Sequence, residues 1–214
     1  MTLYHDSDSI AAMDKRIRAA FINSITGFKP ANLVGTADCA GHSNLAIMSS
    51  VVHLGSHPPL LALVIRPNPV ERHTLDNILE TGVYTINHVS SDIVEAAHQT
   101  AARYPRDTSE FAATGLSELW IDGFAAPFVA QAAIRIGLKL RDQQTIALNQ
   151  THLVIGEIVH AHAPQSCITA EGAIDIEAAG SVALSGLDSY HESRRIKRMA
   201  YAKPDQPPRE LEQR

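Results

Sequence analysis

The chain has 214 residues, of which 45% are hydrophobic and 19% charged, a composition typical of one globular domain with a substantial core. Its formal net charge of −5 disfavours nucleic acid and acidic membrane surfaces as main partners, and no apolar run is long enough to span a membrane. Because Cys39 and Cys167 form no CxxC pair and the N-terminal residues are acidic and polar, we expect a cytoplasmic protein without a secretory signal.

The first predicted element is a helix over about residues 9–26. Gly27 can supply the left-handed residue that ends a helix, and Pro30 prevents its continuation. The apolar residues that recur there at helical spacing are Ile10, Met13, Ile17, Phe21 and Ile25. We therefore expect an amphipathic helix that lies on a core.

Strands dominate the next part of the chain. Residues 31–37 and 44–50 are two runs joined by a polar loop that contains Gly41, which predicts a β-hairpin. A third strand is predicted over residues 60–65, after two prolines. A short helix over 74–80 ends before Gly82, a strand follows over 83–89, and residues 91–102 have helical composition.

Two longer strands are predicted in the second half, over residues 133–140 and 153–163. In the first, apolar residues alternate with Arg135 and Lys139, as in a strand with one buried face. Because strands cluster without regular alternation with helices, the pattern favours a mainly β fold, an antiparallel barrel with added helices.

Charge divides the chain unevenly. The last 23 residues hold seven Lys or Arg and four Asp or Glu, a net charge of +3, against −8 for the rest. We expect one domain over residues 1–192 and a loose basic tail over 193–214. Arg194 and Arg195 in this tail could meet a phosphate, or the tail could simply be solvated.

Several common catalytic motifs are missing from the sequence. It contains no dinucleotide-binding GxGxxG after a strand, no phosphate-binding GxxxxGK[ST], no GxSxG and no HExxH. His160 and His162 lie two apart on a predicted strand and so share a face, which suits a metal pair. No third ligand follows nearby, so we predict no metal site and expect these histidines on an exposed strand face.

The sequence from residue 27 onward resembles the flavin reductase-like, FMN-binding split-barrel family, which includes the flavoredoxins. The resemblance covers about residues 10–192, and His73 departs from it because family members usually have Asp there. The segments that carry it, in the family's order, are NLVGT (32–36), NLAIMSS (44–50), SHPPL (56–60), RHTLDNILETG (72–82), YTIN (84–87) and THLVIGEI (151–158).

The resemblance implies an antiparallel Greek-key split β-barrel that binds FMN and accepts hydride from NADH or NADPH. It also implies a homodimer, with flavin and nicotinamide as small-molecule substrates and a partner oxygenase as one acceptor of the electrons. Because the cofactor performs such chemistry, we expect no catalytic nucleophile or general base in the chain.

The candidate phosphate-binding residues are hydroxyl and cationic side chains. Ser49 and Ser50 follow a predicted strand, and Arg72 and Thr74 lie at the start of a predicted helix, where free N–H groups favour an anion. The residues alone favour a simpler interpretation, in which Thr74 is a helix cap and the serines are a strand end. The family order favours the phosphate.

The flavin ring needs a flat apolar slot with hydrogen bonds at its edge. Thr36 and Asn87 could reach ring or ribityl oxygens, although a buried Asn87 could instead satisfy the backbone, and Tyr190 could cover a ring face. The strand that could provide edge contacts through its main chain comprises Asn44, Leu45, Ala46 and Ile47.

The resemblance places His152 beside the flavin N5, on the nicotinamide side, whereas by itself it is a histidine at a strand start. Three hypotheses remain. The first is an NAD(P)H-dependent flavin reductase; the second is an FMN-binding electron carrier or flavin-storage protein without a nicotinamide site. The third is a structural dimerisation barrel without its cofactor.

Overall fold

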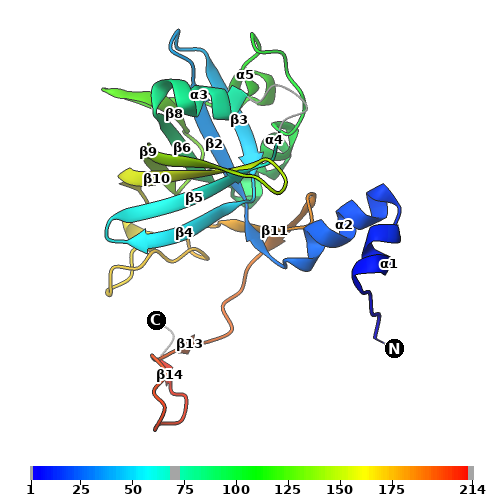
Figure 1. Cartoon of the computed structure of the whole chain (residues 1–214). Helices are drawn as coiled ribbons and strands as arrows, with labels where there is room; N and C mark the ends of the chain where they lie inside the picture. Colours follow the sequence, from blue (N-terminus) through cyan, green and yellow to red (C-terminus); the bar gives the residue numbers. More distant parts are fainter. Residues whose placement is uncertain (1, 68–72, 212–214) are drawn as a thin grey trace.

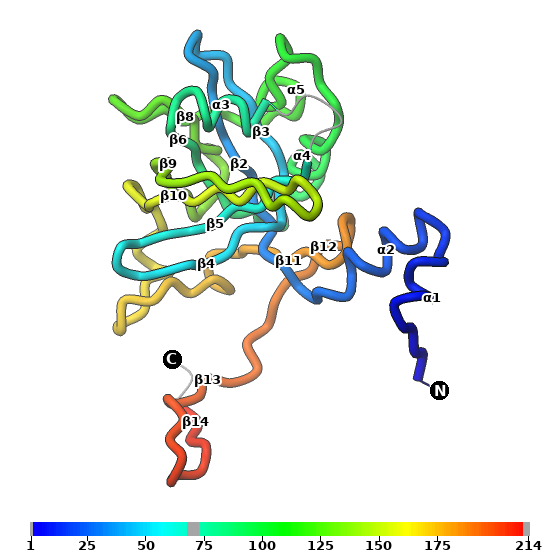
Figure 2. Tube along the Cα trace, viewed as in Figure 1, coloured from blue at the N-terminus to red at the C-terminus, as the bar shows by residue number. Residues whose placement is uncertain are grey.

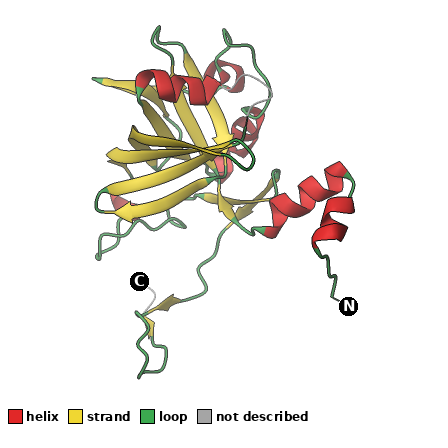
Figure 3. Ribbon diagram, in the orientation of Figure 1, coloured by secondary structure: helices red, strands yellow, loops and turns green. Residues whose placement is uncertain are grey.

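The structure is a computed structural model that describes residues 2–67 and 73–211 (Figure 1). The predicted phosphate ligand Arg72 lies outside the described residues. The fold is mainly β, with short helices around one large sheet (Figure 3). Within the described residues, no helix is long and apolar enough to cross a membrane.

The large sheet has seven strands, and every neighbouring pair in it is antiparallel. In spatial order the strands are β3 (Ser43–Met48), β2 (Asn32–Ala37), β6 (Val83–His88), β9 (Arg135–Ile146), β10 (Thr151–His162), β5 (Pro59–Ile65) and β4 (Val51–Ser56). The antiparallel, mainly β prediction is therefore confirmed.

Chain connectivity forces this sheet to curl. Its edge strands β3 and β4 are consecutive in the sequence and are joined by Ser49 and Ser50 alone. In a flat sheet these edges would lie about 29 Å apart at a spacing of ~4.8 Å per strand. Three Cα–Cα steps reach only about 11 Å. The sheet must therefore bring its two edges close together, and among the described strands no ladder joins β3 to β4.

The inside of the curled sheet holds one of the hydrophobic cores. Helix α3 (His73–Thr81) closes this core by inserting Leu75 and Ile78. The sheet contributes Val34, Leu63, Ile65, Tyr84, Ile86, Leu138 and Val154, all of them buried. Because these residues come from five strands, their burial fixes the register of the sheet.

Strand β8 (Phe124–Val129), which pairs with β7 (Glu118–Ile121), lies across the outer face of β2 and β6. The approach is very close: a Cβ at Gly35 would lie 2.3 Å from the carbonyl oxygen of Pro127. Thr85 donates to the same carbonyl at 2.7 Å. A glycine is therefore required where the two layers cross.

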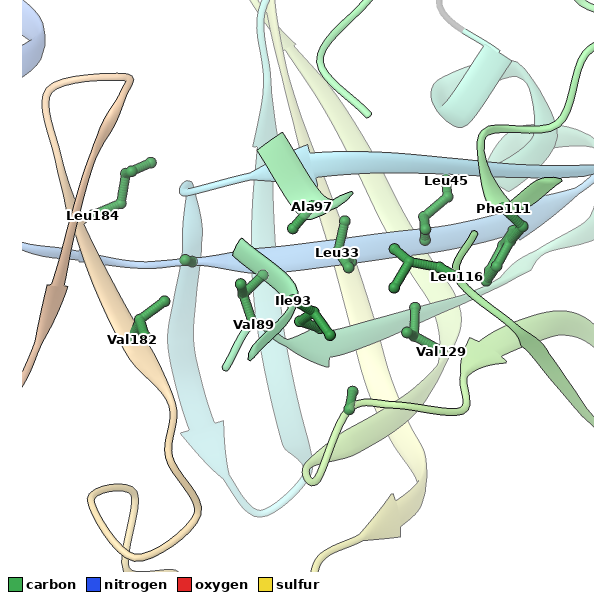
Figure 4. Close-up of a cluster of buried hydrophobic side chains, with 12 residues drawn as sticks. Leu33, Leu45, Val89, Ile93, Ala97, Phe111, Leu116, Val129, Val182 and Leu184 are labelled. Carbon is green, nitrogen blue, oxygen red and sulfur yellow. The ribbon is translucent and has the colours of Figure 1, made fainter. Parts of the chain in front are cut away.

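A second core lies on the outer face, beside β3 (Figure 4). It is covered by the short helices η1 (Ser91–Ile93), α4 (Val94–Gln99) and α5 (Glu110–Thr114) and by strand β11 (Val182–Ser185). Figure 4 shows Leu33 and Leu45 of the sheet facing Ala97, Phe111 and Leu116 of these elements. Thus both faces of β2 are buried.

The two ends of the chain extend from this body (Figure 2). Strand β1 (Lys29–Pro30), β11 and β12 (Ser189–Glu192) form a small sheet, from which helices α1 (Ser7–Ala12) and α2 (Lys15–Ile25) project. After η2 (Gln165–Cys167) and the small sheet, the C-terminal segment leaves the body and forms the hairpin of β13 (Arg198–Met199) and β14 (Glu210–Leu211).

Some predicted elements differ from the structure. The helix predicted over residues 9–26 is divided into α1 and α2, because Asp14 caps a new helix by accepting from the N–H of Arg16. The helix predicted over 91–102 ends at Gln99. His160 does not lie on an exposed face: its ring packs on Phe124, and that of His162 packs on Phe128.

Candidate functional site

A buried cluster of amides and hydroxyls lies where β2, β3 and α3 meet. Asn44 donates from Nδ2 to the hydroxyls of Thr36, at 3.2 Å, and Thr74, at 3.0 Å. Asn77 also donates to the Thr36 hydroxyl, at 3.2 Å. The chain thus brings together three residues predicted from the sequence, Thr36, Asn44 and Thr74, and adds Asn77.

The donors in this cluster fix the direction of the hydroxyl protons. The amides of Asn44 and Asn77 only donate to the hydroxyls, so Thr36 and Thr74 accept in these bonds. Among the described residues, the Thr74 hydroxyl proton therefore remains for a further acceptor, whereas the Thr36 hydroxyl is fully enclosed. Thr74 is also the second residue of α3, where backbone N–H groups are unpaired within the helix. The arrangement suits an anion or a polar ligand rich in oxygen.

One polar atom of the cluster is left over. Asn77 is 2% exposed, and its Oδ1 has no hydrogen-bond partner within the described part of the chain. It lines a small polar pocket with Asn44, Asp38, Arg106 and Glu110. A buried, unsatisfied amide atom costs stability, and such atoms are usually paired in folded proteins. Its presence beside the cluster marks this end of the sheet as the candidate site.

Side chains from the short helices protect the free edge of β3. Glu110 accepts from the N–H of Leu45 at 2.9 Å, and Thr100 accepts from the N–H of Ile47 at 2.9 Å. Burial raises the pKa of the Glu110 carboxyl, while the Leu45 N–H opposes this rise. These two N–H groups of the predicted ring-binding strand are therefore already engaged, and carbonyl oxygens remain as its edge groups.

The other residues of this strand divide between the two faces. Leu45 and Ile47 pack into the outer core, so their side chains point away from the cluster. Ala46 and Ser49 are half-buried near the end of β3. The Ser50 hydroxyl donates to the carbonyl of Val64 at 2.6 Å, which ties the β3–β4 link to β5.

Asn87 lies apart from the cluster, on the outer face. Its Nδ2 donates to the carbonyl of Leu33 at 3.1 Å and to the hydroxyl of Thr85 at 2.9 Å, and its Oδ1 accepts from the N–H of Val129 at 3.0 Å. The residue is fully buried. Of the two interpretations drawn from the sequence, these contacts support backbone satisfaction: Asn87 fastens β8 to the sheet.

Tyr190 and His152 are also separate from the cluster. The Tyr190 hydroxyl lies 3.0 Å from His98 Nδ1, at the edge of the outer core. His152 pairs with Ile65 on β5, and its Nδ1 lies 3.0 Å from Gln143 Nε2 and 3.2 Å from Thr145 Oγ1. These contacts orient the imidazole ring.

The basic tail is partly neutralised near its start. Arg195 forms an ion pair with Asp175 at 3.1 Å, and its backbone N–H donates to Glu177 at 3.3 Å. Its guanidinium therefore has a carboxylate partner within its own chain.

Sequence reasoning did not identify Asn77, Thr100 or Glu110. Asn77 could have been found, because it lies three residues after Thr74 and so on the same face of the predicted helix. Glu110 and Thr100 carry no such signal, since their contacts with β3 join residues more than fifty positions apart.

Comparison with known proteins places the chain in a family. The model of the family described as flavin reductase like domain matches residues 28–171, which is more than half of the chain. The matched region contains all four residues of the cluster. It also contains Thr100 and Glu110, which accept from the N–H groups of β3.

Solved structures agree with this match. A candidate flavin reductase with a split barrel domain from Shewanella frigidimarina is 48% identical, with a TM-score of 0.90, over 94% of this chain and 100% of the other. Flavoredoxin of Desulfovibrio vulgaris is 26% identical, with a TM-score of 0.68, over 84% and 92%. Nitrilotriacetate monooxygenase component B from Bacillus cereus shares the fold at 20% identity, with a TM-score of 0.80, over 91% and 97%.

Proposed function

This chain belongs to the flavin reductase like domain family, and on that premise we propose that it binds FMN and transfers hydride from NADH or NADPH to the flavin N5. The observation that supports this most strongly is the cluster of Thr36, Asn44, Thr74 and Asn77. It orients the Thr74 hydroxyl at the start of a helix, which is chemistry that a phosphate ester requires.

The phosphate end of FMN is assigned to the start of α3. Thr74 contributes its hydroxyl at the first turn of α3, where the helix dipole favours an anion, and Arg72, which precedes α3 in the sequence, contributes a cation. Ser49 adds a hydroxyl from the end of β3. Thr36 is fully enclosed, so in this proposal it positions Asn44 and Asn77, whose amides donate to its hydroxyl, and does not touch the ligand.

The ring is assigned to the free edge of β3, where the curled sheet opens between β3 and β4. We take this opening as the split of a Greek-key split barrel. Because Glu110 and Thr100 occupy the N–H groups of Leu45 and Ile47, the strand faces the ring with carbonyl oxygens, which accept from a donor such as an imide N–H. FMN, when bound, supplies the hydride-accepting centre.

His152 is assigned to the nicotinamide side of the site. Its Nδ1 is engaged by Gln143 and Thr145, so Nε2 is the nitrogen that can meet a ligand. Its role would be to orient the donor ring. His152→Asn should slow flavin reduction while the amount of bound flavin stays unchanged.

The phosphate assignment is tested by removing its two side chains. Arg72→Ala with Thr74→Ala should release FMN, read as loss of visible flavin absorbance from the purified protein. The control is Arg141→Ala with Thr26→Ala, which removes the same residue types from exposed positions elsewhere. Stoichiometric flavin absorbance in the first variant would contradict the assignment.

Anaerobic mixing with NADH or NADPH separates the reductase from the alternative, an FMN carrier or storage protein. Rapid bleaching of bound flavin supports the reductase, whereas flavin that stays oxidised supports the carrier. A purified protein that is colourless and does not bind added FMN would contradict both and favour a structural barrel.

The proposal includes partners. We expect a homodimer of domains that span residues 1–192, each followed by the basic segment 193–214, and an oxygenase as one consumer of the reduced flavin. The likeness in fold to nitrilotriacetate monooxygenase component B supports the oxygenase partner. Faster flavin reduction or tighter flavin retention in the presence of a purified oxygenase would be its signature.

A further inference from the structure

The N-terminal arm, defined as residues 2–28, carries an apolar surface that its own chain does not cover. Helices α1 and α2, both fully described, contain no buried residue. The exposed apolar side chains of the arm are Leu3 (76% exposed), Tyr4 (82%), Ile17 (63%), Ile22 (45%), Ile25 (64%) and Phe28 (71%). Figure 2 shows the arm projecting away from the sheet.

The base of the arm is fastened to the body. Lys29 donates from Nζ to the carbonyls of Asn23, at 2.8 Å, and Gly186, at 3.0 Å. The Phe28 ring packs edge-on against His191 with centroids 4.8 Å apart. Arg66 donates to Asn23 Oδ1 at 3.4 Å. The apolar surface is therefore held out from the body in a fixed direction.

The size of this surface indicates a protein partner. Six side chains of roughly 180 Å² each, about two thirds exposed, amount to ~700 Å². Each partner in a stable interface contributes about 800 Å², so the apolar side chains spread along the arm offer an area of that order. An isolated helix of eleven residues is also marginal in water, so α2 needs a packing surface.

The shape and charge beside α2 favour a second copy of this chain. A groove of about 690 Å³ lies between α2 and the turn that joins β11 to β12, lined by Ile17, Ala20, Phe21 and Leu187 among others. Residues of α2 form one wall of this groove. When two copies meet at a two-fold axis, α2 of each copy therefore packs into the groove of the other, and the same residues lie on both sides of the contact. Arg16 and Asp188 line the same groove and have opposite charges, so each can face the other across the axis.

We propose that the N-terminal arm is the dimerisation element, with the apolar side of α2 in one copy seated in the groove between α2 and the β11–β12 turn of a second copy. This inference rests on the homodimer of the proposed function and names the surface that forms it. It does not depend on the flavin chemistry.

Light scattering after size exclusion tests this at micromolar concentration. The wild type should have the mass of two chains, and Ile17→Glu with Ile25→Glu should have the mass of one. The control is Leu148→Glu, an exposed apolar residue (97%) in the β9–β10 turn, which should remain a dimer. A dimeric arm variant overturns the assignment of the surface, and a monomeric wild type overturns the homodimer itself.

A charge exchange adds a test of register. Arg16→Asp should raise the dimer dissociation constant at least tenfold, and adding Asp188→Arg should restore it. No restoration in the double variant overturns the Arg16–Asp188 pairing. Flavin absorbance of the same samples tests the FMN proposal separately. A protein that is dimeric but binds no flavin contradicts the FMN proposal and leaves the dimer surface unaffected.

Discussion

Two buried amide–hydroxyl networks lie on opposite faces of the large sheet and meet at β2, and they differ in completeness. On the outer face, Asn87 uses both its Nδ2 protons and its Oδ1 to join β2, β6 and β8. On the inner face, the network around Asn44 engages Thr36 and Thr74, while Asn77 Oδ1 has no hydrogen-bond partner among the described residues.

This difference in completeness distinguishes a network that stabilises the fold from one that belongs to the candidate site. A buried polar group with all its bonds made is part of the framework, because nothing remains for a ligand to replace. An incomplete network retains unsatisfied groups, which cost stability until something binds there. Asparagine therefore has two roles in this protein. Asn87 stabilises the fold, whereas Asn44 and Asn77 belong to the candidate site.

The largest expected effect is that of Asn87→Ala. The change leaves the Val129 N–H unpaired, removes the side-chain hydrogen bond to the Leu33 carbonyl and opens a cavity under β8, so we expect the free energy of unfolding to fall by about 4 kcal/mol. Urea unfolding followed by circular dichroism measures it. The amount of FMN bound per folded molecule should be unchanged. A loss of flavin without a loss of stability would contradict the assignment of Asn87 to the framework.

Gly35→Ala is expected to destabilise the protein by about 3 kcal/mol. The new Cβ would meet the Pro127 carbonyl oxygen at 2.3 Å and Thr85 Oγ1 at 2.5 Å, so β8 must shift. Gly55→Ala is the matched control, because its nearest atom would be at 3.4 Å, a normal contact. Thermal unfolding of the two variants compares them, and equal melting temperatures would contradict the packing argument.

Asn77→Ala should have the opposite effect to Asn87→Ala: a small loss of stability and a clear loss of FMN affinity. It removes one hydrogen bond to Thr36 and an oxygen that has no partner in the described part of the chain, so the loss of stability is expected to be only about 1 kcal/mol. The Thr36 hydroxyl loses one of its two amide donors, which loosens the Asn44 amide that orients Thr74, and we expect the Kd for FMN to rise about tenfold. Fluorescence titration measures it. Unchanged affinity would remove Asn77 from the site.

The smallest effect is a dependence of stability on pH from Glu110. Burial raises its pKa above the ordinary 4.5, so the folded protein holds the proton more tightly than the unfolded chain. The stability from this group is full below about pH 4.5 and is lost as the pH rises through the folded pKa. Glu110→Gln keeps an acceptor for Leu45 but does not titrate.

Unfolding of both proteins from pH 4 upward measures this effect. The wild type should lose stability relative to Glu110→Gln as the pH rises. A constant difference across the range would show that the carboxyl is solvated.

Local patterns predicted much of the sheet. The strands containing Thr36, Asn44 and Thr85 were expected within a few residues of their observed bounds, because alternation and turn residues are local signals. The short helix with Thr74 was found for the same reason. Family order brought Thr36, Asn44 and Thr74 into one candidate site.

Long-range register could not be predicted. The face on which Asn87 lies depends on the pairing of β6 with β2 and β9, and a shift of one residue would reverse it. Strand β8 was missed because its position comes from contacts with Asn87 and Thr85, not from its own alanine-rich pattern. The break at Asp14 was missed because a charged residue beside an apolar stripe resembles an uninterrupted helix.

The two-residue link between β3 and β4 has a mechanical consequence. Because the described strands on either side of that opening share no ladder, their separation can change without breaking a backbone hydrogen bond. Ser50 holds the link to β5 through its hydroxyl and its carbonyl, so movement pivots at this serine. The opening is thus a line along which the sheet can widen to admit a ligand while its described ladders stay intact.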